Sequence, residues 1–117
     1  MFGLKESDIE TIRDVLQQFP EVEEAVIYGS RAKGTQKKGS DVDLALKGKA
    51  LNRSMIGQIS YILNEETLMP YYFDVLNFHT LSNKALEEHI NRIGKRLYQK
   101  SDLKVLHEPD KKFKRKS

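Results

Sequence analysis

The sequence predicts an α/β fold of two layers, in which three or four short strands form a small sheet and helices pack on one side of it. Stretches with helical periodicity alternate along the chain with short stretches that have the composition of strands. The length of 117 residues fits one domain, and we find neither an internal repeat nor a second domain. These observations together favour a compact α/β sandwich.

The first predicted helix covers residues 7–19. Its apolar side chains recur at the spacing of one helix face, and they are Ile9, Ile12, Val15, Leu16 and Phe19. Ser7, with Glu10 three residues later, matches a capping box, which places the expected N-cap at Ser7. Pro20 disfavours helical backbone at the residue before it, so we expect the helix to end there.

Three later segments have the composition of strands. They are residues 24–28, 41–47 and 71–76. Two further segments carry helical patterns, residues 52–65 and residues 82–92. We expect Ser82 to cap the second of these and Gly94 to follow its end. Residues 96–98 fit either a short edge strand or one more helical turn.

The most informative stretch is residues 29–43. An apolar strand leads into Gly29-Ser30, and the pair Asp41 and Asp43 follows after ten intervening residues. The main-chain N–H groups of a glycine-containing turn can bind phosphate. Residues two apart on a strand point to the same face, so the two carboxylates are expected to project together.

Two neighbouring carboxylates favour a bound cation. Two ionised carboxylates about 4 Å apart repel by roughly 4 kcal/mol at an effective dielectric constant of 20. A shared proton, full solvation or a divalent cation removes this cost, and the cation is the simplest solution. Oxygen ligands favour Mg²⁺ or Mn²⁺ over Zn²⁺.

Asp74 is the third candidate, because a charged residue inside an apolar strand is costly unless it is paired. If its strand lies beside residues 41–47, Asp74 completes a cluster of three carboxylates. Such a cluster can hold two metal ions, one of them bridging a triphosphate, and can accept a proton from an attacking hydroxyl. The sequence thus predicts metal-assisted chemistry on a nucleoside triphosphate.

Each part also has a purely structural interpretation. Asp-x-Asp is common on solvent-facing strands, Asp74 fits an edge-strand charge that opposes aggregation, and Gly-Ser is a common turn. Arg31 and Lys33 follow the turn and are candidates for phosphate contact, with surface solubility as the alternative. Residues 29–35 lack the lysine of a Walker A loop, which excludes a P-loop ATPase.

With this pattern the chain resembles a minimal nucleotidyltransferase of the DNA polymerase β superfamily. The matching residues are Gly29, Ser30, Asp41, Asp43 and Asp74. The resemblance covers residues 22–98 and implies a nucleotidyltransferase fold with a small mixed sheet. It implies that an acceptor hydroxyl attacks the α-phosphorus of ATP, with release of pyrophosphate.

The resemblance also implies a role for each matching residue. Gly29 and Ser30 would hold the triphosphate, and Asp41 and Asp43 would bind Mg²⁺. Asp74 would deprotonate the acceptor hydroxyl. We therefore expect ATP as substrate and Mg²⁺, as two ions, as cofactor.

Stand-alone members of this group resemble the antitoxin of a two-gene toxin–antitoxin pair, whose partner is a helical HEPN-type ribonuclease toxin. The resemblance implies transfer of AMP to a toxin tyrosine. The chain is too short for a separate acceptor domain, so we expect another chain to hold the acceptor, in a homodimer or a hetero-oligomer. Two alternatives stay open: neutralisation by complex formation with the nucleotide only as ligand, and modification of a small molecule or RNA.

The composition excludes several classes of protein and of binding site. The absence of cysteine excludes disulfides and thiolate metal sites. Apolar runs are too short to span a membrane and no signal-peptide pattern is present, so we expect a cytoplasmic protein without a membrane partner.

The charge is unevenly distributed along the chain. Five of the 20 basic residues lie in residues 111–117, which leaves 15 basic against 17 acidic residues in the rest. We predict a domain over residues 1–100. Residues 101–117 are expected to be a basic, disordered tail or a sequence added for expression, and we expect no nucleic-acid partner.

Overall fold

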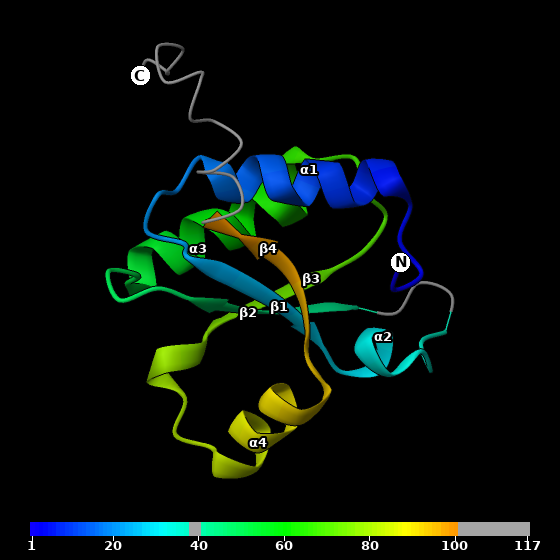
Figure 1. Cartoon of the computed structure of the whole chain (residues 1–117). Helices are drawn as coiled ribbons and strands as arrows, with labels where there is room; N and C mark the ends of the chain where they lie inside the picture. Colours follow the sequence, from blue (N-terminus) through cyan, green and yellow to red (C-terminus); the bar gives the residue numbers. More distant parts are fainter. Residues whose placement is uncertain (38–40, 101–117) are drawn as a thin grey trace.

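The computed structural model describes residues 1–37 and 41–100 (Figure 1). A four-stranded sheet in the order β3-β2-β1-β4 forms its centre. The strands are β1 (Glu24–Tyr28), β2 (Val42–Lys47), β3 (Phe73–Asn77) and β4 (Lys95–Gln99). β1 is antiparallel to β2 and to β4, whereas β2 and β3 are parallel. The predicted mixed sheet is confirmed, and the segment around residues 96–98 is an edge strand.

Helices lie on both faces of this sheet (Figure 1). They are α1 (Glu6–Gln17), α2 (Ser30–Lys33), α3 (Arg53–Tyr61) and α4 (Lys84–Ile93). A π-helical segment, Ile62–Glu66, continues α3, and a 3₁₀ turn, Phe78–Thr80, follows β3. α1 and α3 share one face, as predicted, but α4 packs against the other face.

The alternation of the strands explains this arrangement. Ala25 and Ile27 of β1 belong to the main core under α1 and α3. Val26 and Tyr28 point the other way and form a smaller cluster with Ala45 and with Ile90 of α4. The sheet therefore has apolar positions on both faces, and α4 covers those on the second one. The second face is the one to which Asp43 belongs, because its neighbours Val42 and Leu44 lie in the main core.

The start of α1 differs from the prediction. Lys5 rather than Ser7 occupies the N-cap position, and its main-chain N–H donates to the carboxylate of Asp8 at 3.1 Å. Asp8 is only 8% exposed and also accepts a hydrogen bond of 2.9 Å from the Tyr71 hydroxyl. The capping box predicted with Glu10 is therefore wrong, because the carboxylate that has a second, tertiary partner takes the capping role.

Asparagine side chains cap the other two long helices. Asn52 accepts a hydrogen bond of 2.9 Å from the N–H of Met55 at the start of α3. Asn83, rather than the predicted Ser82, accepts one of 3.0 Å from Leu86 at the start of α4. Both contacts satisfy an N–H group that has no partner within its helix.

Two further predictions concern membrane-spanning helices and the C-terminal tail. Among residues 1–37 and 41–100, none of the helices combines the length and the apolar character that crossing a bilayer requires. The predicted basic tail, residues 101–117, lies outside the described residues. Its disorder stays a prediction.

Candidate active site

Tyr28, Asp43 and Asp74 form a row across three adjacent strands. In the antiparallel pair of β1 and β2, Tyr28 lies opposite Asp43, and in the parallel pair of β2 and β3, Asp43 lies opposite Asp74. Residues in register on neighbouring strands share a face, and the strands are about 4.8 Å apart. The prediction that the Asp74 strand lies beside residues 41–47 is therefore confirmed.

The carboxylates of this row influence each other electrostatically. Asp43 is half-buried, and this burial raises its pKa. The negative charges of Asp74 and Asp41 raise the pKa of Asp43 further, and the guanidinium of Arg31 lowers it. Asp41, just before β2, and Asp74 are exposed. Two solvent-accessible carboxylates thus flank one that is partly desolvated.

This donor set fits a hard divalent cation in its chemistry. The oxygen atoms of Asp41, Asp43 and Asp74 are ligands that Mg²⁺ prefers, and a cation would relieve the repulsion that raises the pKa of Asp43. Within residues 1–37 and 41–100, no three acidic or histidine side chains already form a complete metal cage. Mg²⁺ usually keeps several waters and binds substrate phosphates in addition to one or two carboxylates. Asp41 and Asp43 are therefore the candidate protein ligands of such an ion.

Gly29 brings the Gly-Ser turn, the candidate phosphate-binding segment, against Asp43. Its φ of +74° lies in the left-handed region, which favours glycine. A Cβ atom at Gly29 would lie 2.4 Å from Oδ2 of Asp43, so a side chain at this position would require the carboxylate or the turn to move. Gly29 is the N-cap of α2, and the first N–H groups of a helix lack partners within the helix. The turn and the carboxylate are thus in direct contact, as a shared site for phosphate and metal requires.

Arg31 is buried behind the turn, with only 3% of its surface exposed. Its Nε donates to the carbonyl oxygen of Asp41 at 3.3 Å, and its Nη1 donates to that of Phe2 at 2.9 Å. The guanidinium carbon lies 4.9 Å from the centre of the Tyr71 ring. Arg31 therefore ties the start of β2 and the N-terminal segment to α2. Lys33, the other predicted cation, is exposed at the end of the same short helix.

Tyr28 borders the candidate site, which the sequence pattern did not indicate. It is 6% exposed, and its ring packs edge-on against His89 of α4, with 6.2 Å between the ring centres. Burial raises the pKa of Tyr28, and the charges of Asp43 and Asp74 raise it further. Its hydroxyl therefore stays neutral and borders the carboxylates on the β1 side. Only the register of β1 and β2 shows that Tyr28 lies beside the carboxylates. In the sequence, Tyr28 simply fits the end of an apolar strand.

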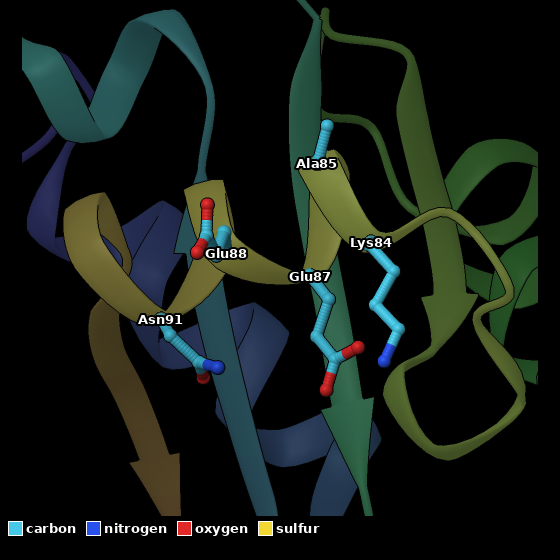
Figure 2. A pocket seen from close by; sticks show the side chains of 5 residues that line it. All are labelled: Lys84, Ala85, Glu87, Glu88 and Asn91. Carbon is cyan, nitrogen blue, oxygen red and sulfur yellow. The ribbon is translucent and has the colours of Figure 1, made fainter.

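A hollow on the surface of α4 is separate from this row (Figure 2). Its lining contains both signs of charge and an amide, and the residues are Lys84, Ala85, Glu87, Glu88 and Asn91. None of them belongs to the Gly-Ser turn or to the three aspartates. We therefore do not assign the nucleotide site to this hollow.

The raised pKa of Asp43 predicts that this residue destabilises the fold. The folded protein binds a proton at Asp43 more readily than the unfolded chain does. The contribution of Asp43 to the free energy of unfolding therefore falls as the pH rises from the ordinary pKa of an aspartate to the raised pKa of Asp43. We expect Asp43→Asn to raise the Tm at pH 7 in EDTA, because the variant has no carboxylate charge to desolvate at this position.

Thermal unfolding of the wild type and Asp43→Asn measures this difference. Added Mg²⁺ should raise the Tm of the wild type and leave that of the variant nearly unchanged, because ligand binding stabilises only a protein that has the site. A variant less stable than the wild type in EDTA would contradict the electrostatic account.

Comparison with known proteins identifies the family and the fold of the chain. The family model described as "Polymerase beta, Nucleotidyltransferase" matches residues 10–103. Among solved structures, a toxin–antitoxin complex with AMP-PNP has 18% identity and a TM-score of 0.65, over 94% of this chain and 95% of that one. An MNT antitoxin bound to a tri-AMPylated HEPN toxin, from Shewanella oneidensis, has 15% identity and a TM-score of 0.63, over 87% and 79% of the two chains.

A third similar structure, the toxin–antitoxin complex MntA–HepT, has 15% identity and a TM-score of 0.63, over 86% of this chain and 79% of that one. No curated protein matches the sequence at a significant level. At these identities the structural likenesses show a shared fold, and the family model covers most of the chain. The chain therefore belongs to the polymerase β nucleotidyltransferase family and has the fold of a minimal nucleotidyltransferase.

Proposed function

We propose that this protein is a Mg²⁺-dependent nucleotidyltransferase that transfers AMP from ATP to a hydroxyl group of a partner protein. The observation that carries the proposal is the contact of Gly29 with Asp43, together with the register of Asp43 and Asp74. This arrangement brings together the Gly-Ser turn, the candidate metal ligands and the candidate base. Phosphoryl-type transfer needs mainly such positioning and charge neutralisation.

Each residue of the site has a role in this proposal. Gly29 and Ser30 hold the triphosphate through main-chain N–H groups, and Asp41 and Asp43 hold Mg²⁺. Bound Mg²⁺ would supply charge neutralisation on the phosphate oxygens. Lys33 is exposed and can reach a phosphate directly, whereas Arg31 contributes its positive charge from behind the turn.

Asp74 acts as the base. Its exposed position on an edge strand leaves it accessible to an acceptor from another molecule. The acceptor oxygen forms a bond to the α-phosphorus, the bond from that phosphorus to the bridging oxygen breaks, and pyrophosphate leaves. The proton of the acceptor hydroxyl passes to the Asp74 carboxylate. Removal of this proton makes the acceptor oxygen a stronger nucleophile.

We further propose that the acceptor belongs to a HEPN-type toxin and that the protein acts as its antitoxin. Two facts support this partner. Similar structures are antitoxin chains in complexes with such toxins, and in one complex the toxin is AMPylated. The described residues form one small α/β unit, and in this proposal the acceptor belongs to a second chain in a hetero-oligomer or a homodimer. A cytoplasmic location is part of this proposal.

Coexpression with a cognate toxin separates catalysis from simple binding. If the protein acts by AMP transfer, the toxin recovered from cells with the wild type carries one or more AMP groups by mass spectrometry. Cells with Asp41→Asn/Asp43→Asn would then contain unmodified, active toxin. Full neutralisation by the double variant would instead support complex formation with the nucleotide only as ligand.

A further inference from the structure

The side chain of Asn64 binds the main chain of β3 at the residue that precedes Asp74. Its Oδ1 accepts a hydrogen bond of 2.7 Å from the N–H of Phe73, and its Nδ2 donates one of 2.9 Å to the Phe73 carbonyl oxygen. One amide group thus makes both hydrogen bonds that a neighbouring strand would make with this residue. Phe73 is fully buried, so its main-chain groups need these partners.

This contact lies at the open edge of the sheet. β3 is the first strand in the order β3-β2-β1-β4, so β2 pairs with it on one side and no described strand pairs with it on the other. β2 sets the register in which Asp74 lies opposite Asp43. A slip of one residue would turn Asp74 to the other face of the sheet. Asn64 opposes such a slip from the outer side.

The backbone around Asn64 is adapted to this contact. Asn64 lies in the π-helical segment Ile62–Glu66, where the wider turn follows directly on α3. Leu63, its neighbour, is fully buried in the main core and anchors the segment under the sheet. Single π-helical turns are rare and often occur at functional sites. Here the turn places one residue in the core and the next at the edge of the strand that carries the candidate base.

We infer that Asn64 is a positioning residue, which holds Asp74 in register with Asp43 for AMP transfer. This inference rests on the proposed function. Asn64 acts through the β3 main chain and need not touch the nucleotide or the acceptor. No sequence pattern indicates this role, because Asn64 lies inside a helical pattern and its partner, Phe73, is nine residues away.

The kinetics of Asn64 variants distinguish a positioning role from a merely structural one. Loss of two partly buried hydrogen bonds should lower the Tm in either case. If Asn64 only stabilises, the folded fraction of a variant will transfer AMP at the normal rate. If it positions Asp74, kcat will fall while the KM for ATP changes little, because Gly29, Asp41 and Asp43 remain in place. A misplacement of about 1 Å is enough to cost roughly 100-fold in rate.

The experiment compares Asn64→Ala and Asn64→Asp with Asn52→Ala at a temperature at which all three are folded. Asn64→Asp keeps the acceptor for the Phe73 N–H and guards against a failure of the alanine variant to fold. Asn52→Ala is the matched control, because Asn52 also binds a main-chain group of α3, at Met55, far from Asp74 in the sequence. Loss of this cap should lower the Tm as well.

We expect Asn64→Ala to lower kcat by about 10-fold to 100-fold with the KM for ATP within about 3-fold, and Asn52→Ala to leave both nearly unchanged. In an Asp74→Ala background, Asn64→Ala should have little further effect on the residual rate, because the two residues act as a unit. A normal kcat in a folded Asn64 variant, or a full further loss in the Asp74→Ala background, would overturn the inference.

Amide hydrogen exchange tests the contact without relying on activity. The Phe73 N–H should be protected in the wild type and should exchange faster in Asn64→Ala, with the β1 amides unaffected. Equal protection in both proteins would overturn the contact itself. If the wild type transfers no AMP, the proposed function fails, and the exchange result still reports whether Asn64 holds β3.

Discussion

Replacing Asp41 and Asp43 together with asparagine should lower AMP transfer by a factor of about 10³ or more, because both proposed metal ligands lose their charge. Asparagine has the shape of aspartate, and Asp41 is exposed while Asp43 is only half-buried. The fold should therefore survive. Circular dichroism and thermal unfolding check the fold, and release of pyrophosphate with incorporation of labelled AMP measures the reaction.

Asp14→Asn is the matched control for this prediction. Asp14 is an exposed aspartate of α1, so its replacement removes a surface charge far from the row of Tyr28, Asp43 and Asp74. Transfer should be unchanged in this variant. Normal transfer by a folded Asp41→Asn/Asp43→Asn protein would show that the proposed metal mechanism is wrong.

Gly29→Ala is expected to have the second-largest effect. The new Cβ would lie 2.4 Å from Oδ2 of Asp43, on a residue whose φ is +74°. Either the turn or the carboxylate must move, and the alanine backbone is strained as well, which should cost about 1–3 kcal/mol of stability. We expect AMP transfer to fall by about 100-fold, because the turn that would hold the phosphate and the carboxylate that would hold the metal ion are moved apart.

Gly57→Ala provides the contrast. Gly57 lies within α3, and a Cβ atom there would meet no atom within 4 Å. Alanine is the better helix former, so this variant should be more stable than the wild type by roughly 0.5–1 kcal/mol, with unchanged transfer. The Tm and the rate of AMP incorporation of both variants are compared with those of the wild type. Equal rates for Gly29→Ala and Gly57→Ala would contradict the proposed contact between turn and carboxylate.

Local patterns in the sequence predicted most of the fold. The alternation of residues 42–46 places apolar side chains in the main core, and Asp43 therefore faces away from it. The proximity of Asp74 to Asp43 was predicted on the condition that their strands are neighbours, and the parallel pairing meets that condition. These predictions succeeded because strand periodicity determines which side chains share a face.

Features that depend on tertiary partners could not be predicted in this way. The periodicity of α4 indicates an apolar face, but it cannot indicate which side of the sheet that face will cover. Arginine is mostly exposed in proteins, so the burial of Arg31 against the carbonyl groups of Asp41 and Phe2 has no signal in the sequence. Likewise, Tyr28 and Asn64 acquire their roles through strand register and through an open sheet edge.

The most direct test of the central claim, AMP transfer to a partner protein, uses α-labelled ATP and Mg²⁺ in a lysate of the source cells. The wild type and Asp41→Asn/Asp43→Asn are compared for the fate of the label. We predict label on a single protein band with the wild type, and none with the double variant. Absence of aspartate-dependent label on any protein would contradict the claim and direct the search to RNA, small molecules or nucleotide binding alone.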